Sequence, residues 1–129
     1  MIALSAGKSV AGQWRNERGS VLILRVEGTQ LSGSYRTAVG NPDPRDDYPV
    51  SGIVHGDLLA FSVAWIGHDS LTSWTGRHEA GEDRLRTLWH LVRSHTTTID
   101  PLTLTPNRHP VAIWGAFTTQ ASVFDRFRN

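Results

Sequence analysis

The chain has 129 residues, the length of one domain, and contains no cysteine, which excludes a disulfide scaffold, a cysteine zinc site and a thiol nucleophile. With 13 basic and 12 acidic residues its net charge is +1, and so balanced a charge does not indicate binding to nucleic acid or to an anionic membrane. We therefore expect one domain over residues 1–129, with neither nucleic acid nor a membrane as its partner.

Short runs rich in Val, Ile, Leu, Thr and Trp follow one another along the whole chain, separated by turn residues. Apolar and polar side chains alternate within them, which is typical of β-strands, and no stretch keeps a convincing helical period. Thr96–Pro110, rich in Thr and Pro, is expected to be irregular. In chain order the predicted strands are Gly12–Asn16, Val21–Glu27, Gln30–Thr37, Tyr48–Val54, Leu58–Trp65, Ser70–His78, Arg84–Arg93 and Ile113–Ser122.

This series of short strands and tight turns favours a sandwich or an up-and-down barrel. An eight-stranded barrel has room inside for one small ligand, and alternate residues of each strand face that interior. The predicted inward residues are Ser20, Leu22, Leu24, Val26, Leu31, Gly33, Tyr35, Thr37, Phe61, Val63, Trp65, Ser70, Thr72, Trp74, Gly76, Leu85, Thr87, Trp89 and Leu91.

Several inward residues carry hydroxyl groups toward one end of the strands. A plain core would not need them there, because a buried hydroxyl without a partner costs free energy. Hydroxyls that converge among Trp rings are typical of a small-molecule site. No general base with a partner and no serine–histidine–aspartate order accompanies them, so we do not expect an enzyme. These positions are Ser20, Tyr35, Thr37, Ser70 and Thr72.

Five stretches in this chain resemble the avidin/streptavidin family, in the family's order and at similar spacing. The resemblance implies an all-β fold, an eight-stranded antiparallel up-and-down barrel over about residues 11–122. It also implies high-affinity, non-catalytic binding of biotin in the open end, with no cofactor and no metal. The stretches are Gly12–Ser20 (GQWRNERGS), Leu31–Asn41 (LSGSYRTAVGN), Phe61–Trp65 (FSVAW), Ser70–Gly76 (SLTSWTG) and Thr87–Trp89 (TLW).

The resemblance also implies roles for polar side chains. Asn16, Ser20 and Tyr35 match the three donors that surround the ureido oxygen of biotin. Thr37 matches the acceptor of one ureido N–H group, and Thr72 matches the hydroxyl near the ring sulfur. These residue types suit the task, since a polarised carbonyl oxygen is stabilised by several donors at once.

At the other end of the ligand, Ser70 and the backbone N–H of Asn41 match the pair that holds the carboxylate. The remaining matches are the aromatic walls with a leucine beside them, and a loop that closes over the ligand. These are Trp65, Trp74, Trp89, Leu91, Val39 and Gly40.

Purely structural roles compete with some of these assignments. Asn16 would also cap a turn, and Ser20 and Thr37 would also serve as strand-end hydroxyls. Trp14 is predicted to fill the core. The six histidines show no metal-ligand spacing and are expected to be solvated; they are His55, His68, His78, His90, His95 and His109.

One departure from the family concerns the last strand, where the family places an acidic or amide acceptor just before a Phe. Aligned on Phe117, that position falls on Gly115, and after a shift on Ala116; neither side chain accepts a hydrogen bond. A lost acceptor would weaken binding by about 1–3 kcal/mol. The alternative function is therefore a weakened site that recognises a biotin derivative, another small cyclic ligand or a peptide.

A second departure concerns assembly. Tetrameric members send a Trp into a neighbour's site, and here Thr96–Leu102 has none, while Trp114 comes too late. A homodimer is expected instead, and the family resemblance implies a secreted or periplasmic protein. The predicted outer face of the barrel is small and apolar, as an interface would be, with Ala60, Ser62, Ala64, Leu71, Ser73, Thr75, Leu88 and Val92.

Overall fold

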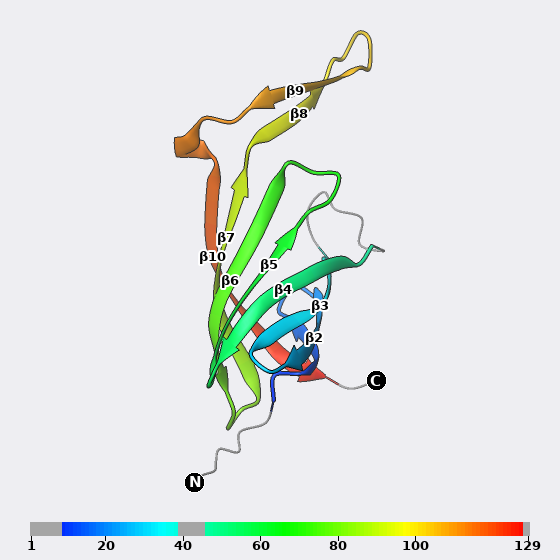
Figure 1. The fold of residues 1–129 in the computed structure, drawn as a ribbon. Coiled ribbons are helices and arrows are strands. Elements are labelled where there is room, and N and C mark those ends of the chain that lie inside the picture. Colours follow the sequence, from blue (N-terminus) through cyan, green and yellow to red (C-terminus); the bar gives the residue numbers. More distant parts are fainter. Residues whose placement is uncertain (1–8, 39–45, 128–129) are drawn as a thin grey trace.

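The computed structural model describes residues 9–38 and 46–127. Over these residues, eight antiparallel strands close into a barrel, in which the last strand pairs with both β7 and β1 (Figure 1). The predicted all-β barrel is confirmed. Its strands are β1 (Gly12–Asn16), β2 (Val21–Glu27), β3 (Gln30–Arg36), β4 (Tyr48–His55), β5 (Leu58–Ala64), β6 (Ser70–Glu79), β7 (Arg84–Arg93) and β10 (Phe117–Phe127).

Side-chain alternation and one close backbone approach explain the curvature at β2 and β3. In β2, Leu22 and Leu24 are buried, whereas Ile23 and Arg25 are exposed. In β3, Gly33 has a φ of +154°, and a Cβ atom there would lie 1.8 Å from the backbone oxygen of Ile23. Because only glycine tolerates this approach, Gly33 lets the two strands bend together into the barrel wall.

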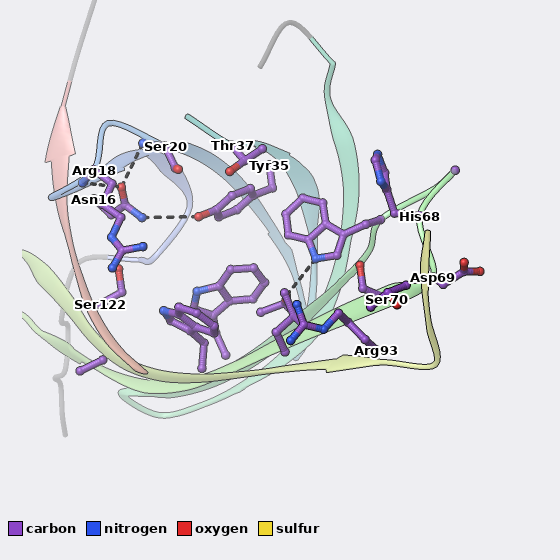
Figure 2. Close-up of a pocket in the computed structure, with 18 of the residues that line it drawn as sticks. Asn16, Arg18, Ser20, Tyr35, Thr37, His68, Asp69, Ser70, Arg93 and Ser122 are labelled. Carbon is purple, nitrogen blue, oxygen red and sulfur yellow. Dashed lines mark hydrogen bonds between the residues drawn. The ribbon is translucent and has the colours of Figure 1, made fainter. Parts of the chain in front are cut away.

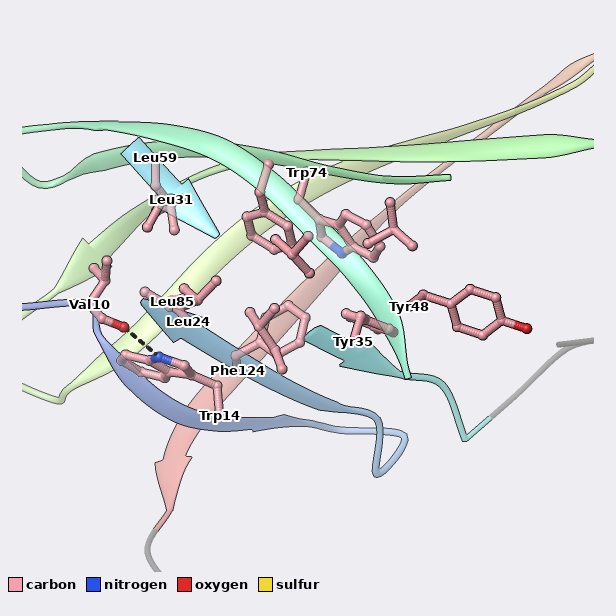
Figure 3. Packing of buried hydrophobic residues seen from close by; sticks show 14 of the residues in the cluster. Val10, Trp14, Leu24, Leu31, Tyr35, Tyr48, Leu59, Trp74, Leu85 and Phe124 are labelled. Atoms are coloured by element: carbon pink, nitrogen blue, oxygen red, sulfur yellow. Dashed lines mark hydrogen bonds between the residues drawn. The ribbon is translucent and has the colours of Figure 1, made fainter. Parts of the chain in front are cut away.

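Trp14 closes the end of the barrel opposite the mouth. Its side chain is fully buried, and its Nε1 donates a 2.9 Å hydrogen bond to the carbonyl oxygen of Val10. The Arg126 guanidinium carbon lies 4.3 Å from the centre of the Trp14 ring system. From here the buried cluster continues through Phe124 to Tyr35 near the mouth (Figure 3). The prediction that Trp14 fills the core is confirmed.

His78 does not lie in solvent as the sequence predicted. Only 5% of the residue is exposed, and its ring meets that of Trp14 edge-on at 5.7 Å between centroids. Its Nε2 lies 2.9 Å from Asp83 Oδ1. The cause is the alternation of β6, which places His78 on the same inward face as Thr72 and Trp74.

The last strand differs most from its predicted range of Ile113–Ser122. Ile113–Gly115 form a short 3-10 helix, η1, and β10 begins only at Phe117 and continues to Phe127. The barrel therefore extends to Phe127, beyond the predicted limit near residue 122. Other strand ends shift by one residue: β3 ends at Arg36, β4 at His55, β5 at Ala64 and β6 at Glu79.

The Thr96–Pro110 segment is not irregular, because it contains most of an antiparallel hairpin. Strand β8 (His95–Ile99) pairs with β9 (Pro106–Pro110), and the pair projects beyond the barrel between β7 and β10 (Figure 1). Asp100 shapes the tip, since its Oδ1 accepts hydrogen bonds from the backbone N–H groups of Leu102 and Thr103. In the part of the chain that the structure describes, no helix is long and apolar enough to cross a membrane.

Candidate functional site

A cavity of about 570 Å³ opens at the mouth of the barrel (Figure 2). It is lined by β1, β3, β6, β7 and β10, together with the β1–β2 and β5–β6 turns and the start of the hairpin. Val39, Gly40 and Asn41 lie outside the described residues. The structure brings the other predicted site residues together around this cavity: Asn16, Ser20, Tyr35, Thr37, Trp65, Ser70, Thr72, Trp74, Trp89 and Leu91.

Asn16 at the end of β1 both caps a turn and faces the cavity. Its Oδ1 accepts hydrogen bonds from the backbone N–H groups of Arg18 at 3.0 Å and Ser20 at 2.9 Å. These two bonds leave the amide Nδ2 pointing at the Tyr35 hydroxyl, 3.5 Å away (Figure 2). The turn-capping role and the binding role are therefore compatible, because they use different atoms of one side chain.

Ser20, Tyr35 and Thr37 gather beside Asn16, at one end of the cavity, and all three are buried. Ser20 Oγ accepts the backbone N–H of Ala38 at 3.0 Å, so its own O–H remains able to donate. Burial raises the pKa of Tyr35 to about 12. The phenol therefore keeps its proton at neutral pH and is a hydrogen-bond donor there.

Aromatic rings form the walls of the cavity. The Tyr35 ring lies 4.9 Å from that of Trp74 and 5.7 Å from that of Trp65, measured between centroids. Phe61 stacks behind Trp74 at 4.9 Å. Trp89 pairs directly with Trp74 across β6 and β7. Flat apolar walls of this kind suit a ligand with a compact ring.

A second hydroxyl position lies beneath Trp65. The indole Nε1 of Trp65 donates a 2.9 Å hydrogen bond to Thr72 Oγ1, which holds both side chains in place. Thr72 is buried, and its O–H proton remains to be donated toward the cavity. Ser70 on β6 and Leu91 on β7 lie farther toward the mouth, and both are partly buried.

Ser122 on β10 is a cavity residue that the sequence reasoning missed. It is 4% exposed, and its hydroxyl donates a 2.9 Å hydrogen bond to the carboxylate of Glu17 in the β1–β2 turn. Both residues line the cavity, and Ser122 lies at the same end as Asn16 and Tyr35 (Figure 2). A serine oxygen that gives its proton to a carboxylate keeps its lone pairs for an incoming N–H group.

The predicted acceptor position at Gly115 or Ala116 is therefore wrong. Both lie at η1 before β10 begins, and neither lines the cavity. The Phe that marks the register is Phe124, which is fully buried, and not Phe117, which is 58% exposed. Ser122 stands two residues before Phe124 and presents a hydroxyl oxygen at the cavity, where neither Gly115 nor Ala116 could place an acceptor.

The rim of the cavity carries charged and titratable side chains that the sequence analysis also missed. Inward alternation along β7 could have identified Arg93, which follows Trp89 and Leu91 on the same face. The others lie in turns or in the hairpin, where no alternation marks them. The rim residues are Glu17, Arg18, His68, Asp69, Arg93 and His95, with Gly67, Thr96, Thr97 and Ala121 completing the lining beside Ser122.

Asp69 joins the hairpin to the rim. Arg108 of β9 donates to both of its carboxylate oxygens, from Nη2 at 2.7 Å and from Nε at 2.9 Å. The hydrogen bonds from Arg108 hold the pKa of Asp69 below its usual range. Asp69 is thus an anion whose charge is already paired at the edge of the cavity.

The arrangement suits the recognition of a small polar ring. Donors cluster at the inner end, aromatic rings enclose the middle, and hydroxyls and cations surround the mouth. The hydroxyls of Ser20 and Thr72 are fixed by bonds to neighbouring N–H groups, so their remaining donors have defined directions. A preformed cavity with a few oriented polar groups is typical of ligand binding.

Comparison with known proteins points to one family. The sequence profile described as Avidin family matches residues 5–104, well over half of the chain. Afifavidin from Afifella pfennigii is 36% identical over 91 residues, which cover 64% of this chain and 57% of afifavidin. The match thus spans less than two thirds of that relative's length.

Solved structures with a similar fold are also avidins by name. A rhizavidin–biotin complex superimposes with a TM-score of 0.71 at 26% identity, covering 94% of both chains. A complex of a shwanavidin variant with biotin gives a TM-score of 0.68 at 26% identity, covering 93% of this chain and 99% of the other. Together with the closed eight-stranded barrel and the cavity at its mouth, these matches show that the chain belongs to the avidin family.

Proposed function

We propose that this chain binds biotin, one molecule per chain, in the mouth of the barrel, and that it catalyses no reaction. The observation that carries the proposal is the convergence of Asn16 Nδ2, the Ser20 hydroxyl and the Tyr35 hydroxyl at the inner end of the cavity. Three donors around one point suit a polarised carbonyl oxygen such as that of a cyclic urea.

The two N–H groups of a cyclic urea need acceptors as well. Thr37 is buried beside the donor cluster and is proposed to accept one of them. Ser122 Oγ, which donates to Glu17, is proposed to accept the other. The alternative of a weakened site rested on a missing acceptor, so this hydroxyl removes its basis.

The rest of the ligand is matched by the walls and the mouth. Trp65, Trp74 and Trp89 would enclose the fused ring, with Thr72 near the sulfur atom. Ser70 and Leu91 would meet the acyl chain and its carboxylate. The biotin complexes of rhizavidin and of the shwanavidin variant, which share this fold, support the choice of ligand.

A binding role is also supported by how two of the cavity hydroxyls, those of Ser20 and Thr72, are held. A nucleophilic serine or threonine needs a base that takes its proton. Ser20 and Thr72 instead accept hydrogen bonds from the Ala38 backbone N–H and the Trp65 indole. These contacts fix the hydroxyls as donors to a ligand, which is the task of a recognition site.

The working unit is proposed to be a homodimer formed through the outer face of β5, β6, β7 and β10. Leu71, Val92 and Phe117 form one row across that face, and Leu71 and Phe117 are 40% and 58% exposed. Leu88, 47% exposed, belongs to a parallel row. Contiguous exposed apolar side chains on neighbouring strands suit a two-fold contact with a second copy.

Thermal denaturation with and without biotin tests the proposed ligand. A ligand that binds only the native state raises the melting temperature, and at a concentration about 1,000 times Kd it adds about 4 kcal/mol of stability. Titration calorimetry should then give one biotin per chain, with a change in Trp fluorescence. If biotin at a large excess over the protein changes neither the melting temperature nor the fluorescence, the proposal is wrong.

A further inference from the structure

Arg93 lies where the inward face of β7 reaches the mouth of the barrel. Leu85 and Thr87 are buried on this face, and Trp89 and Leu91 follow them toward the rim. Arg93 is the next residue of the series and lines the same cavity. Its position therefore continues the wall of the site, whereas a merely solvating arginine would occupy the outward positions of the strand.

Arg93 stands directly beside Ser70, its partner in the β6–β7 register. Side chains of directly opposed residues on one face have Cβ atoms about 5 Å apart. In Figure 2 Arg93 and Ser70 lie together at the mouth, and the Arg93 side chain reaches inward over the cavity. A hydroxyl donor and a guanidinium thus face the same small region.

The guanidinium has no anionic partner among residues 9–38 and 46–127. The nearby carboxylate, Asp69, is engaged by Nε and Nη2 of Arg108. His68 and His95 also line the rim, and Asp69 is the carboxylate beside them. The mouth therefore presents a cation that is ready to pair with a charged group of a ligand.

The position also matches the length of the proposed ligand. Arg93 lies four residues beyond Trp89, about 13 Å along the strand at about 3.3 Å per residue. A fused ring held between Trp74 and Trp89, followed by a five-carbon acyl chain, would bring its terminal group to this rim.

We propose that Arg93 is a specificity-determining residue: beside Ser70, which the family resemblance already places at the carboxylate end, its guanidinium makes the site prefer ligands that end in a free carboxylate over the same ring with a neutral ester or amide end. The guanidinium and the hydroxyl donate together to the carboxylate oxygens, and charged hydrogen bonds of this kind are stronger than neutral ones. The site is thus built for the free acid, and the amide-linked form, as in biotin attached to a lysine, loses the ionic contact. This inference rests on the proposed function.

Titration calorimetry with biotin and with biotin amide tests this role of Arg93. The unmodified protein should bind the free acid about 2- to 5-fold more tightly than Arg93→Gln does, the range expected for one exposed ion pair. Binding of the amide should be the same in both proteins. Raising the salt concentration from about 0.05 M to about 1 M should weaken binding of the acid and leave the amide unaffected.

Arg25→Gln is the matched control, because Arg25 is exposed on the outward face of β2 and its loss removes the same charge far from the cavity. It should leave both affinities unchanged. If biotin and the amide bind equally well to the unmodified protein and to Arg93→Gln, the role of Arg93 is refuted while biotin binding stands. If neither compound binds the unmodified protein, the proposed function itself fails.

Discussion

At the scale of single residues, the site works through donors whose directions are set by bonds to the backbone. Asn16 is held by two backbone N–H groups, and Ser20 by one. Removing a single ligand-facing atom should therefore cost the ligand one hydrogen bond without repacking the barrel. This separation makes individual roles measurable.

Replacing Tyr35 with Phe is expected to weaken biotin binding by about 1–2 kcal/mol, because the ring stays and one donor to the ureido oxygen is lost. The fold should remain stable, since the ring contacts with Trp65 and Trp74 persist. Calorimetry measures the affinity and thermal denaturation the stability. Tyr48→Phe is the control, because Tyr48 is buried against Trp65 without lining the cavity. Equal affinity in both variants would make Tyr35 a packing residue only.

Replacing Ser122 with Ala should also weaken binding, by about 1–3 kcal/mol, because a buried N–H of the ligand would then lack its acceptor. Glu17→Gln should have a smaller effect in the same direction, since the amide no longer draws the serine proton as strongly. Thr119→Ala, on the outward face of the same strand, serves as the control. Unchanged affinity in Ser122→Ala would mean that another group serves this N–H.

Site residues on strands were predictable because alternation and motif agree there. Tyr35, Thr72 and Trp74 each stand at an inward position inside a recognisable stretch, and all three line the cavity. Ser122 was missed for a physical reason that concerns two phenylalanines. Phe117 and Phe124 are an odd number of positions apart, so they face opposite sides of β10, and only burial distinguishes them.

At the scale of elements, the β8–β9 hairpin has almost no buried apolar side chains to stabilise it. A two-stranded hairpin is marginally stable in water, and here its residues are nearly all exposed. Its anchors are the Arg108–Asp69 ion pair and the backbone bonds from Ser94 to Asp69 and from Val111 to Ser94. The sequence could not reveal this hairpin, because strands exposed on both faces show no apolar alternation.

Arg108→Gln should loosen the hairpin without destabilising the barrel. An exposed ion pair contributes at most about 1 kcal/mol, so the melting temperature should change little. Amide hydrogen exchange should accelerate over residues 95–110 and stay unchanged in β2 and β6. Arg36→Gln removes a comparable exposed pair, between Arg36 at the end of β3 and Asp47 just before β4, and should leave the hairpin unaffected. Unaltered exchange in the hairpin would show that the backbone anchors suffice.

At the scale of the whole molecule, the outer face of β6 and β7 should decide the assembly. Leu88→Asp places a charge in the proposed contact and should convert a dimer into a 14.3 kDa monomer in light scattering. Ile23→Asp adds the same charge to the exposed side of β2 and should leave the dimer intact. A monomeric unmodified protein at micromolar concentration would contradict the proposed dimer, and a tetramer would show that a second contact exists.

The pairing of β1 with β10 has a consequence for synthesis on the ribosome. Gln13 lies opposite Phe127, so the barrel cannot close before the last strand has left the exit tunnel. Until then β1 and β7 are open edges whose unpaired backbone groups attract other strands. Contacts between distant parts of a chain form slowly, and a nascent sheet with two free edges is prone to aggregate. Pairing of β1 with β10 is therefore the step that removes both free edges and protects a newly made chain from aggregation.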